Sequence, residues 1–251
     1  MNYTSLCQIS PDNDTWIIKV RIIRMWDAVN IAQGNELISL DLIMSDENGT
    51  LIHSSIRNKF AQRFRPLLNE GCIYEIKNFI FEEYRAQYRP VHHQFKILFI
   101  LTTSVSKIHE INQSIPQYGF ELADYETITS RCNAHTYLTD VIGRLESVGA
   151  IKEVKSKGCP TKIRTIHLLL EENKILQITL WGAKAYQIDE DFHKNTPRPA
   201  IAIVTSTIVK TYRGQYNLSS TSATRIYINL DIPEVDTVEE RCNSRSESNE
   251  D

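Results

Sequence analysis

Alternating apolar and polar positions near the start of the chain predict its first β-strand. In residues 16–22 every even position is apolar, whereas Lys19 and Arg21 occupy odd positions. Successive side chains of a strand point to opposite faces of the sheet. We therefore expect one buried face on this strand, with the two basic residues on the outer face.

The same patterning continues through the first hundred residues. Apolar residues within 58–68 recur at the spacing of a short amphipathic helix, and Asn48-Gly49 is typical of a hairpin turn. The predicted elements are strands at 16–22, 37–44 and 51–57, a helix at 58–68, and strands at 72–81 and 95–101.

A second segment repeats this order from about residue 140. It has predicted strands at 141–145, 164–170, 175–181, 200–211 and 216–221, with a turn at 171–174 and a short helix at 183–188. A shift of 125 residues aligns Ile56 with Trp181. A shift of 128 aligns 84–88 with 212–216, where four of five residues are identical. Such repetition indicates a duplicated domain.

A unit of about 100 residues with five strands, and a helix after the third, has the element order of the OB fold, a small Greek-key barrel. We therefore predict an all-β protein with short helices, built from two tandem OB-fold barrels. The predicted divisions are a first barrel at 1–103, a linker at 104–139, a second barrel at 140–233 and an acidic tail at 234–251. The tail has almost no apolar content, so we expect it to be disordered.

Charge is distributed unevenly, although the formal net charge is only −3. Residues 1–103 hold 11 basic and 11 acidic side chains, residues 140–233 hold 13 and 9, and residues 234–251 hold 2 and 7. The second segment is therefore mildly basic and the tail is acidic. A polyanionic ligand would have to be held by local basic patches together with other contacts.

Motifs of the common enzyme classes are absent from the sequence. The chain has no GxxxxGK[ST], GxGxxG, GxSxG or HExxH motif. Its five cysteines form no CxxC pair, and His92-His93 has no spaced Cys or His partner. No apolar run approaches the roughly 20 residues that cross a bilayer. We therefore expect a protein that is not an enzyme, with no metal, cofactor or membrane partner.

Aromatic residues beside basic ones are the most informative candidates for function. In the strand at 175–181, Trp181 shares a face with Gln177 and Thr179, and the apolar positions share the other face. A tryptophan on a solvent-facing strand can stack on an unpaired base. The alternative is a tryptophan that covers the end of the barrel beneath the following helix.

Two predicted hairpins repeat a pattern of tyrosine and arginine. Each has two tyrosines around an arginine: Tyr84, Arg85 and Tyr88 in the first segment, and Tyr212, Arg213 and Tyr216 in the second. Rings stack on bases and guanidinium groups pair with phosphates, so both hairpins are candidate contacts for a nucleic-acid strand. Further basic candidates are Lys19, Arg21 and Arg164. The alternative for all of these residues is an ordinary solvated surface.

Several stretches resemble the central tandem DNA-binding region of the replication protein A large subunit, in its plant-type variants. The resemblance rests on residues 16–21, 45–49, 180–182 and, most specifically, 218–222 with 228–234. It implies two OB folds that bind single-stranded DNA without strong sequence preference. The protein-recruiting barrel and the zinc-containing assembly barrel of that large chain have no counterpart here, so the chain looks like a shortened paralogue or one derived from a mobile element.

The resemblance also implies roles for particular residues. It places the stacking pair of the second barrel on Trp181 and Tyr212, and one stacking ring of the first barrel on Tyr88. The other stacking position falls on Ile56, which cannot stack as an aromatic ring does. The phosphate-contacting positions fall on Arg21 in the first barrel and Arg164 in the second.

These observations predict a nuclear, single-stranded DNA-binding protein that acts in replication, repair or recombination. Other replication protein A subunits or repair proteins are its further expected partners. Two other functions fit the same fold: an RNA-binding protein, since stacking does not distinguish the sugars, and a protein-interaction module that binds no DNA. We expect the second barrel to bind DNA more tightly than the first, because it is more basic and has a complete aromatic pair.

Overall fold

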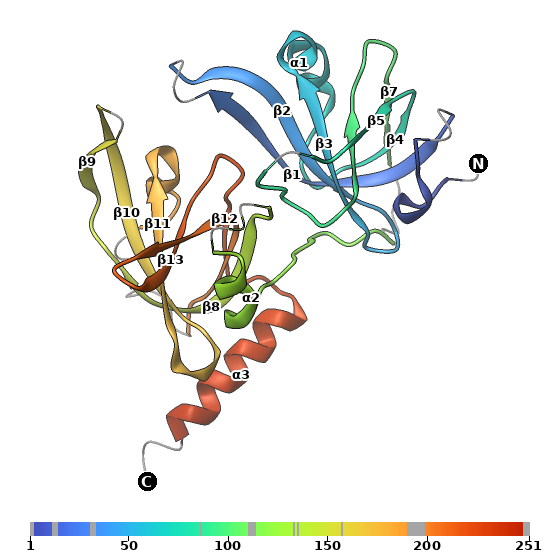
Figure 1. The fold of residues 1–251 in the computed structure, drawn as a ribbon. Helices are drawn as coiled ribbons and strands as arrows, with labels where there is room; N and C mark the ends of the chain where they lie inside the picture. Colours follow the sequence, from blue (N-terminus) through green and yellow to red (C-terminus); the bar gives the residue numbers. More distant parts are fainter. Residues whose placement is uncertain are drawn as a thin grey trace. The chain divides into compact units, whose positions relative to one another are not determined.

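The chain forms two compact units, Met1–Phe120 and Glu121–Asp251. A computed structural model describes residues 3–11, 15–30, 34–85, 87–109, 114–132, 134, 136–156, 158–189 and 199–247. Each unit is built on its own β-sheet (Figure 1). The predicted all-β architecture of two tandem barrels is confirmed.

The described residues of the first unit form seven strands, with a short helical segment after the third. The strands are β1 (Ile17–Asn30), β2 (Glu36–Ser45), β3 (Leu51–Arg57), β4 (Ile73–Lys77), β5 (Ile80–Glu83), β6 (Phe95–Leu98) and β7 (Ser104–Ile108). The helical elements are η1 (Leu6–Gln8), α1 (Asn58–Phe64) and η3 (Arg65–Leu67). The sheet order is β5-β6-β3-β2-β1-β4-β7, with β3 and β6 parallel.

The second unit repeats this connectivity. Its strands are β8 (Thr139–Val148), β9 (Lys152–Ser156), β10 (Cys159–Leu169), β11 (Ile175–Trp181), β12 (Ile201–Tyr212), β13 (Gln215–Ser219) and β14 (Ile226–Ile228). The helical elements are α2 (Tyr125–Ser130), η4 (Glu171–Asn173), η5 (Gly182–Tyr186) and α3 (Pro233–Glu247). The order is β11-β13-β12-β8-β10-β9, and β11 also pairs with β10, so this sheet closes on itself.

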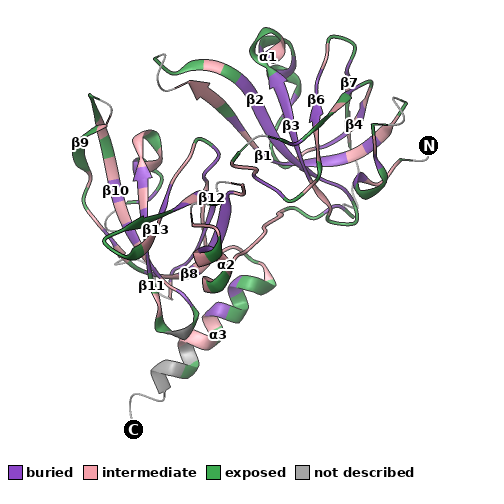
Figure 2. Ribbon diagram, viewed as in Figure 1, coloured by how far each residue is buried: buried purple, intermediate pink, exposed green. Residues whose placement is uncertain are grey.

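Each barrel buries the apolar face that strand alternation predicts. In the first unit Ile18, Val20 and Ile22 of β1 lie in the core, and in the second Leu176, Ile178 and Leu180 of β11 do the same. Figure 2 shows buried residues along these strands and exposed residues in many of the loops. Burial of one apolar face on the central strands therefore stabilises each barrel.

Backbone pairing fixes which residues of the two barrels are equivalent. β3 pairs in parallel with β6 at His53 and Lys96, and β11 pairs in parallel with β13 at Gln177 and Asn217. Both β3 and β11 lead directly into a helical turn. A shift of 124 therefore relates β3 to β11, one residue less than the shift that sequence comparison suggested.

The ends of the units differ from the sequence-based division. Residues 104–108, expected in the linker, form β7 and pair with β4, and Val105 packs on the first core. The prediction of a disordered tail at 234–251 is wrong for residues 234–247, which belong to α3 (Pro233–Glu247) and bury Val235 and Val238. Two valines three residues apart lie on one helix face, which gives even a charged helix a side to bury. None of the described helices has the length and apolarity to cross a membrane.

Candidate nucleic-acid interface

The outer face of the first barrel carries a buried stack of three rings. Trp26 of β1 stacks on His53 of β3, with ring centroids 5.7 Å apart and 10° between the planes. Tyr84, which follows β5, lies against His53 with centroids 5.3 Å apart and planes tilted by 38°. The face exists because core and outer residues alternate along β3, so His53 points away from the core that Ile52 enters.

A buried carboxylate anchors the middle of this stack. Asp41 Oδ1 accepts hydrogen bonds from Ser39 Oγ at 2.8 Å and Ser55 Oγ at 2.6 Å, and Asp41 Oδ2 lies 3.3 Å from His53 Nε2. Burial acts to raise the pKa of Asp41, but the contacts with His53 and Ser55 outweigh it and hold that pKa below its ordinary value. Burial, aided by Lys96, lowers the pKa of His53 despite the neighbouring Asp41.

Tyr84 is enclosed rather than presented to solvent. Its side chain is only 6% exposed, and the charged groups of Arg89 and Lys96 lie 5.2 Å and 5.8 Å from its ring centroid. Burial raises the pKa of the Tyr84 hydroxyl. The expectation of a tyrosine exposed on this hairpin is therefore wrong for Tyr84, because its ring finds aromatic partners across the sheet.

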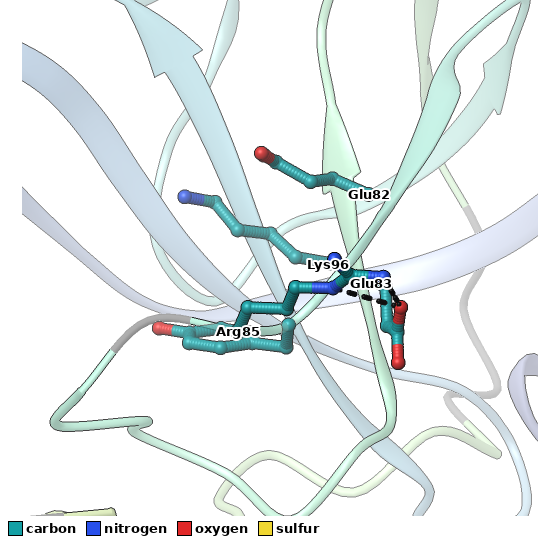
Figure 3. A pocket seen from close by; sticks show the side chains of 5 residues that line it. Glu82, Glu83, Arg85 and Lys96 are labelled. Carbon is teal, nitrogen blue, oxygen red and sulfur yellow. Dashed lines mark hydrogen bonds and ion pairs between the residues drawn. The ribbon is translucent and has the colours of Figure 1, made fainter.

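The arginine beside Tyr84 is exposed but already paired. Arg85 Nη2 lies 2.6 Å from Glu83 Oε2, and both line a cavity of about 440 Å³ together with Glu82, Tyr84 and Lys96. Figure 3 shows this arrangement, with the dashed contacts running from Arg85 to Glu83. A phosphate would have to compete with this carboxylate for Arg85.

The basic residues of the first strand also differ from expectation. Arg21 is only 2% exposed: its Nε and Nη2 donate to the carbonyl of Ile115 at 3.2 and 2.9 Å, and its Nη1 donates to the carbonyl of Gly71 at 2.5 Å. Burial lowers the pKa of Arg21. Arg21 lies on the face of β1 opposite the core, as predicted, but the segment around Ile115 covers it, so its expected exposure to a ligand is wrong. Lys19 is half-buried, with Nζ 5.9 Å from the ring centroid of Tyr3.

The second barrel presents its hairpin tyrosine openly. Tyr212 is 64% exposed, and the guanidinium of Arg213 lies 5.2 Å from its ring centroid. Arg213 and Gly214 have φ values of 52° and 76°, which two-residue hairpin turns of type I′ require. Within the described residues no carboxylate pairs with Arg213. Ring and charge therefore stand together on one exposed turn.

Trp181 and Arg164 supply buried hydrogen-bond donors in the same barrel. The indole Nε1 of Trp181, and Nε and Nη1 of Arg164, are buried without a hydrogen-bond partner among the residues that the structure describes. Arg164 is 7% exposed. Buried donors without acceptors are costly in a folded protein, and a ligand with acceptor oxygens would satisfy them.

The register separates the two predicted stacking rings of the second barrel. Tyr212 pairs with Gln215, and the β11–β13 register places Gln215 level with Ile175, six residues before Trp181. At about 3.3 Å per residue the separation along the strands is about 20 Å. A bound strand would therefore meet the two rings at different nucleotides.

Tyr88 and Tyr216 are not equivalent, despite the repeated sequence around them. Tyr216 follows a two-residue turn, and its ring meets Tyr125 edge-on at 6.3 Å and packs on the second core. Tyr88 lies within the longer connection 84–94 and has a φ of 61°. By strand register, the first-barrel equivalent of Tyr216 is Phe95.

Ile56 is a core residue and not a vacant stacking position. It is fully buried and is equivalent to Leu180, whereas the residue equivalent to Trp181 is the exposed Arg57. Strand parity with Ile52 could have revealed this. Trp26 was missed because β1 continues to Asn30, beyond the alternating run that predicted it.

The histidine pair has a structural role in the first unit. Nδ1 of His93 accepts from the backbone N–H of Phe95 at 3.0 Å, and its Nε2 lies 3.1 Å from the carbonyl of Leu6. No group of three His, Cys, Asp or Glu side chains suited to a metal ion occurs within the described part of the chain.

Comparison with known proteins divides the chain as the structure does. Residues 7–130 match the family described as domain of unknown function DUF223, and residues 129–229 match the replication protein A OB domain. The chain is 26% identical over 236 residues to the replication protein A 70 kDa DNA-binding subunit of Xenopus laevis, and 25% identical over 241 residues to one of the corresponding 70 kDa subunits of Arabidopsis thaliana. Each alignment covers 91% of this chain and 36% of the relative.

A solved structure shares the fold. A replication protein A heterotrimer bound to single-stranded DNA contains a chain that superposes with a TM-score of 0.62, at 24% identity, over 96% of this chain and 55% of that one. The tandem OB architecture is therefore common to both.

Proposed function

Since this chain is related to the large DNA-binding subunit of replication protein A across both barrels, we propose that it binds single-stranded DNA with little sequence preference. The observation that carries the proposal is the exposed turn of Tyr212 and Arg213 on the second barrel. An exposed ring beside a cation suits an unpaired base and its phosphate, and every base has a face that can stack.

The mechanism combines stacking with phosphate contacts. Stacking on Tyr212 and Trp181 contributes about 1–3 kcal/mol per base. The exposed guanidinium of Arg213 donates charge-assisted hydrogen bonds to phosphate oxygens. The buried donors of Arg164 join in only if the strand opens the surface above them. Because the barrels are covalently joined, a strand held by one meets the other at an effective concentration on the order of mM.

The proposal also covers the cellular process, the location and the partners of the protein. The names of the relatives describe DNA-binding subunits, so we assign a binding role rather than an enzymatic one, in replication, repair or recombination in the nucleus. The solved relative is a heterotrimer, and other replication protein A subunits are therefore proposed partners. Copurification of tagged chain with those subunits tests this part.

Fluorescence anisotropy with oligo-dT, oligo-rU and duplex DNA of equal length tests the central claim. We expect oligo-dT to bind at least about tenfold more tightly than duplex, because bases stack on rings only when unpaired. Equal affinity for oligo-dT and duplex would refute stacking. Preference for oligo-rU would favour an RNA-binding role, and no binding to any of the three would favour a protein-interaction module.

A further inference from the structure

Tyr84 and Tyr212 occupy equivalent positions in the two barrels, but Tyr84 is buried and Tyr212 is exposed. Tyr84 N–H bonds to the carbonyl of Gln94 directly after the β5–β6 ladder, and Tyr212 pairs with Gln215 at the same place in the β12–β13 ladder. Tyr212 is 64% exposed and Tyr84 is 6% exposed. The difference in exposure between the two tyrosines therefore comes from the side chains next to each ring.

The second barrel has no rings at the positions that hold Tyr84. The shift of 124 that relates β3 to β11 makes exposed Gln177 the equivalent of His53. Trp26 lies opposite Asp41, and in the second barrel Gly149 donates its N–H to Thr165, the equivalent of Asp41, at 2.8 Å. Glycine and glutamine stand where the first barrel has tryptophan and histidine.

The surroundings of Tyr84 are those that an unpaired base requires. One side of its ring meets His53, and the charged groups of Arg89 and Lys96 lie within 6 Å of its centroid. Asp41 Oδ2 is a hydrogen-bond acceptor 3.3 Å from His53 Nε2, at the edge of that ring. A base needs a flat ring to stack on, acceptors or donors at its edge, and cations near its phosphate.

We propose that the ring of His53, on which Trp26 stacks, is a base-stacking site of the first barrel, and that Tyr84 fills this site in the DNA-free protein as a surrogate base. A nucleobase enters by displacing Tyr84. This inference rests on the proposed single-stranded DNA-binding function. It adds a site that a view of the exposed surface does not reveal.

Displacement of Tyr84 is compatible with the fold. Tyr84 is the first residue of the connection 84–94, next to the edge strand β5, so its ring can leave without separating core strands. Arg85 beside it is exposed. Because Tyr84 competes with the base, the apparent affinity of the first barrel is reduced by the fraction of molecules in which the site is open.

Matched alanine substitutions in the two barrels test the inference by anisotropy with oligo-dT. Tyr84→Ala in the full chain should tighten binding at least about threefold, because it removes the competitor. Tyr212→Ala should weaken binding at least about fivefold, because it removes a stacking ring. Tyr84→Phe keeps the ring and should leave affinity within about twofold of wild type.

A second measurement leaves Tyr84 in place, so it remains informative if Tyr84→Ala does not fold. In the double variant Trp16→Phe, Trp181→Phe, Trp26 is the only tryptophan of the three that remains. Saturating oligo-dT should change its emission, because a base then replaces Tyr84 on His53, the ring on which Trp26 stacks. Unchanged Trp26 emission, or unchanged or weakened affinity in Tyr84→Ala, overturns the inference while wild-type binding leaves the function standing. A wild-type chain that does not bind oligo-dT overturns both.

Discussion

The two barrels share a backbone register but differ in how they use the residues on it. In the first barrel, the ring of Tyr84 lies against His53 and Arg85 is paired with Glu83. In the second, Tyr212 and Arg213 stand exposed on a tight turn. Two duplicated barrels with the same strand pairing can therefore differ at their surfaces, because the side chains next to an equivalent tyrosine decide whether its ring is exposed.

The largest expected effect is a difference in DNA affinity between the two barrels when each is produced as a separate chain. Each unit has its own core, so residues 121–251 and 1–120 can be compared as separate chains. The second unit should bind oligo-dT at least about tenfold more tightly, because two rings at about 1–3 kcal/mol each are accessible there. Equal or reversed affinities in anisotropy titrations would break the comparison.

A substitution at Ile56 distinguishes core from surface. Because Ile56 is fully buried in the first core, Ile56→Phe should overpack it and lower the free energy of unfolding by about 1–3 kcal/mol. Thermal melting monitored by circular dichroism measures this. Arg57→Phe at the exposed neighbouring position is the matched control and should leave the melting temperature nearly unchanged. Tighter DNA binding by Ile56→Phe at unchanged stability would contradict the register.

Salt dependence separates the arginines of the two barrels. Arg213→Gln should reduce the slope of log K against log[salt] by about 0.7, the value for one phosphate contact on a single strand. Arg21→Gln should leave the slope unchanged, since its guanidinium donates to the carbonyls of Ile115 and Gly71. Arg241→Gln on α3, where Arg241 pairs with Glu171, is the control. A slope lowered by Arg21→Gln would show that Arg21 reaches phosphate.

The smallest expected effect is a pH dependence confined to the first barrel. The pKa of His53 is lowered in the folded state, so the unfolded chain binds a proton more readily and stability falls as pH drops below the ordinary histidine pKa of about 6.5. The lowered pKa of Asp41 removes further stability below about pH 4. Melting of residues 1–120 between pH 7 and pH 5 measures the first effect. His53→Gln, which introduces the residue of the second barrel, should flatten it.

Most of the strands and their buried faces were predicted from the alternation of apolar and polar residues along the sequence. The apolar positions of β1 and β11 are buried as expected, because burial of one sheet face is a local property of the sequence. The exposure of Tyr212 also agrees with the prediction from the hairpin pattern.

The site around Tyr84 and His53 in the first barrel could not be predicted from local sequence patterns, because its residues are far apart in the sequence. Tyr84 packs against His53, which lies 31 residues earlier in the sequence, and His53 in turn stacks on Trp26, which lies 58 residues before Tyr84. Arg21 is covered by Ile115, a residue 94 positions later. The repeated residues at 84–88 and 212–216 suggested equivalence, but the connections differ in length, and only strand pairing showed that Tyr216 corresponds to Phe95.

In the turn at Arg213 and Gly214, the stability of the fold and the affinity for DNA favour different residues at position 213. An arginine at a φ of 52° occupies a conformation that asparagine or glycine adopts more readily. Selecting variants for heat resistance alone would therefore favour Arg213→Asn or Arg213→Gly. Either change would relax the backbone and remove the cation above Tyr212, so the most stable version of this hairpin would be a poorer one for holding a polyanion. An engineer who wants to raise stability without losing DNA binding should therefore keep Arg213 and change other positions.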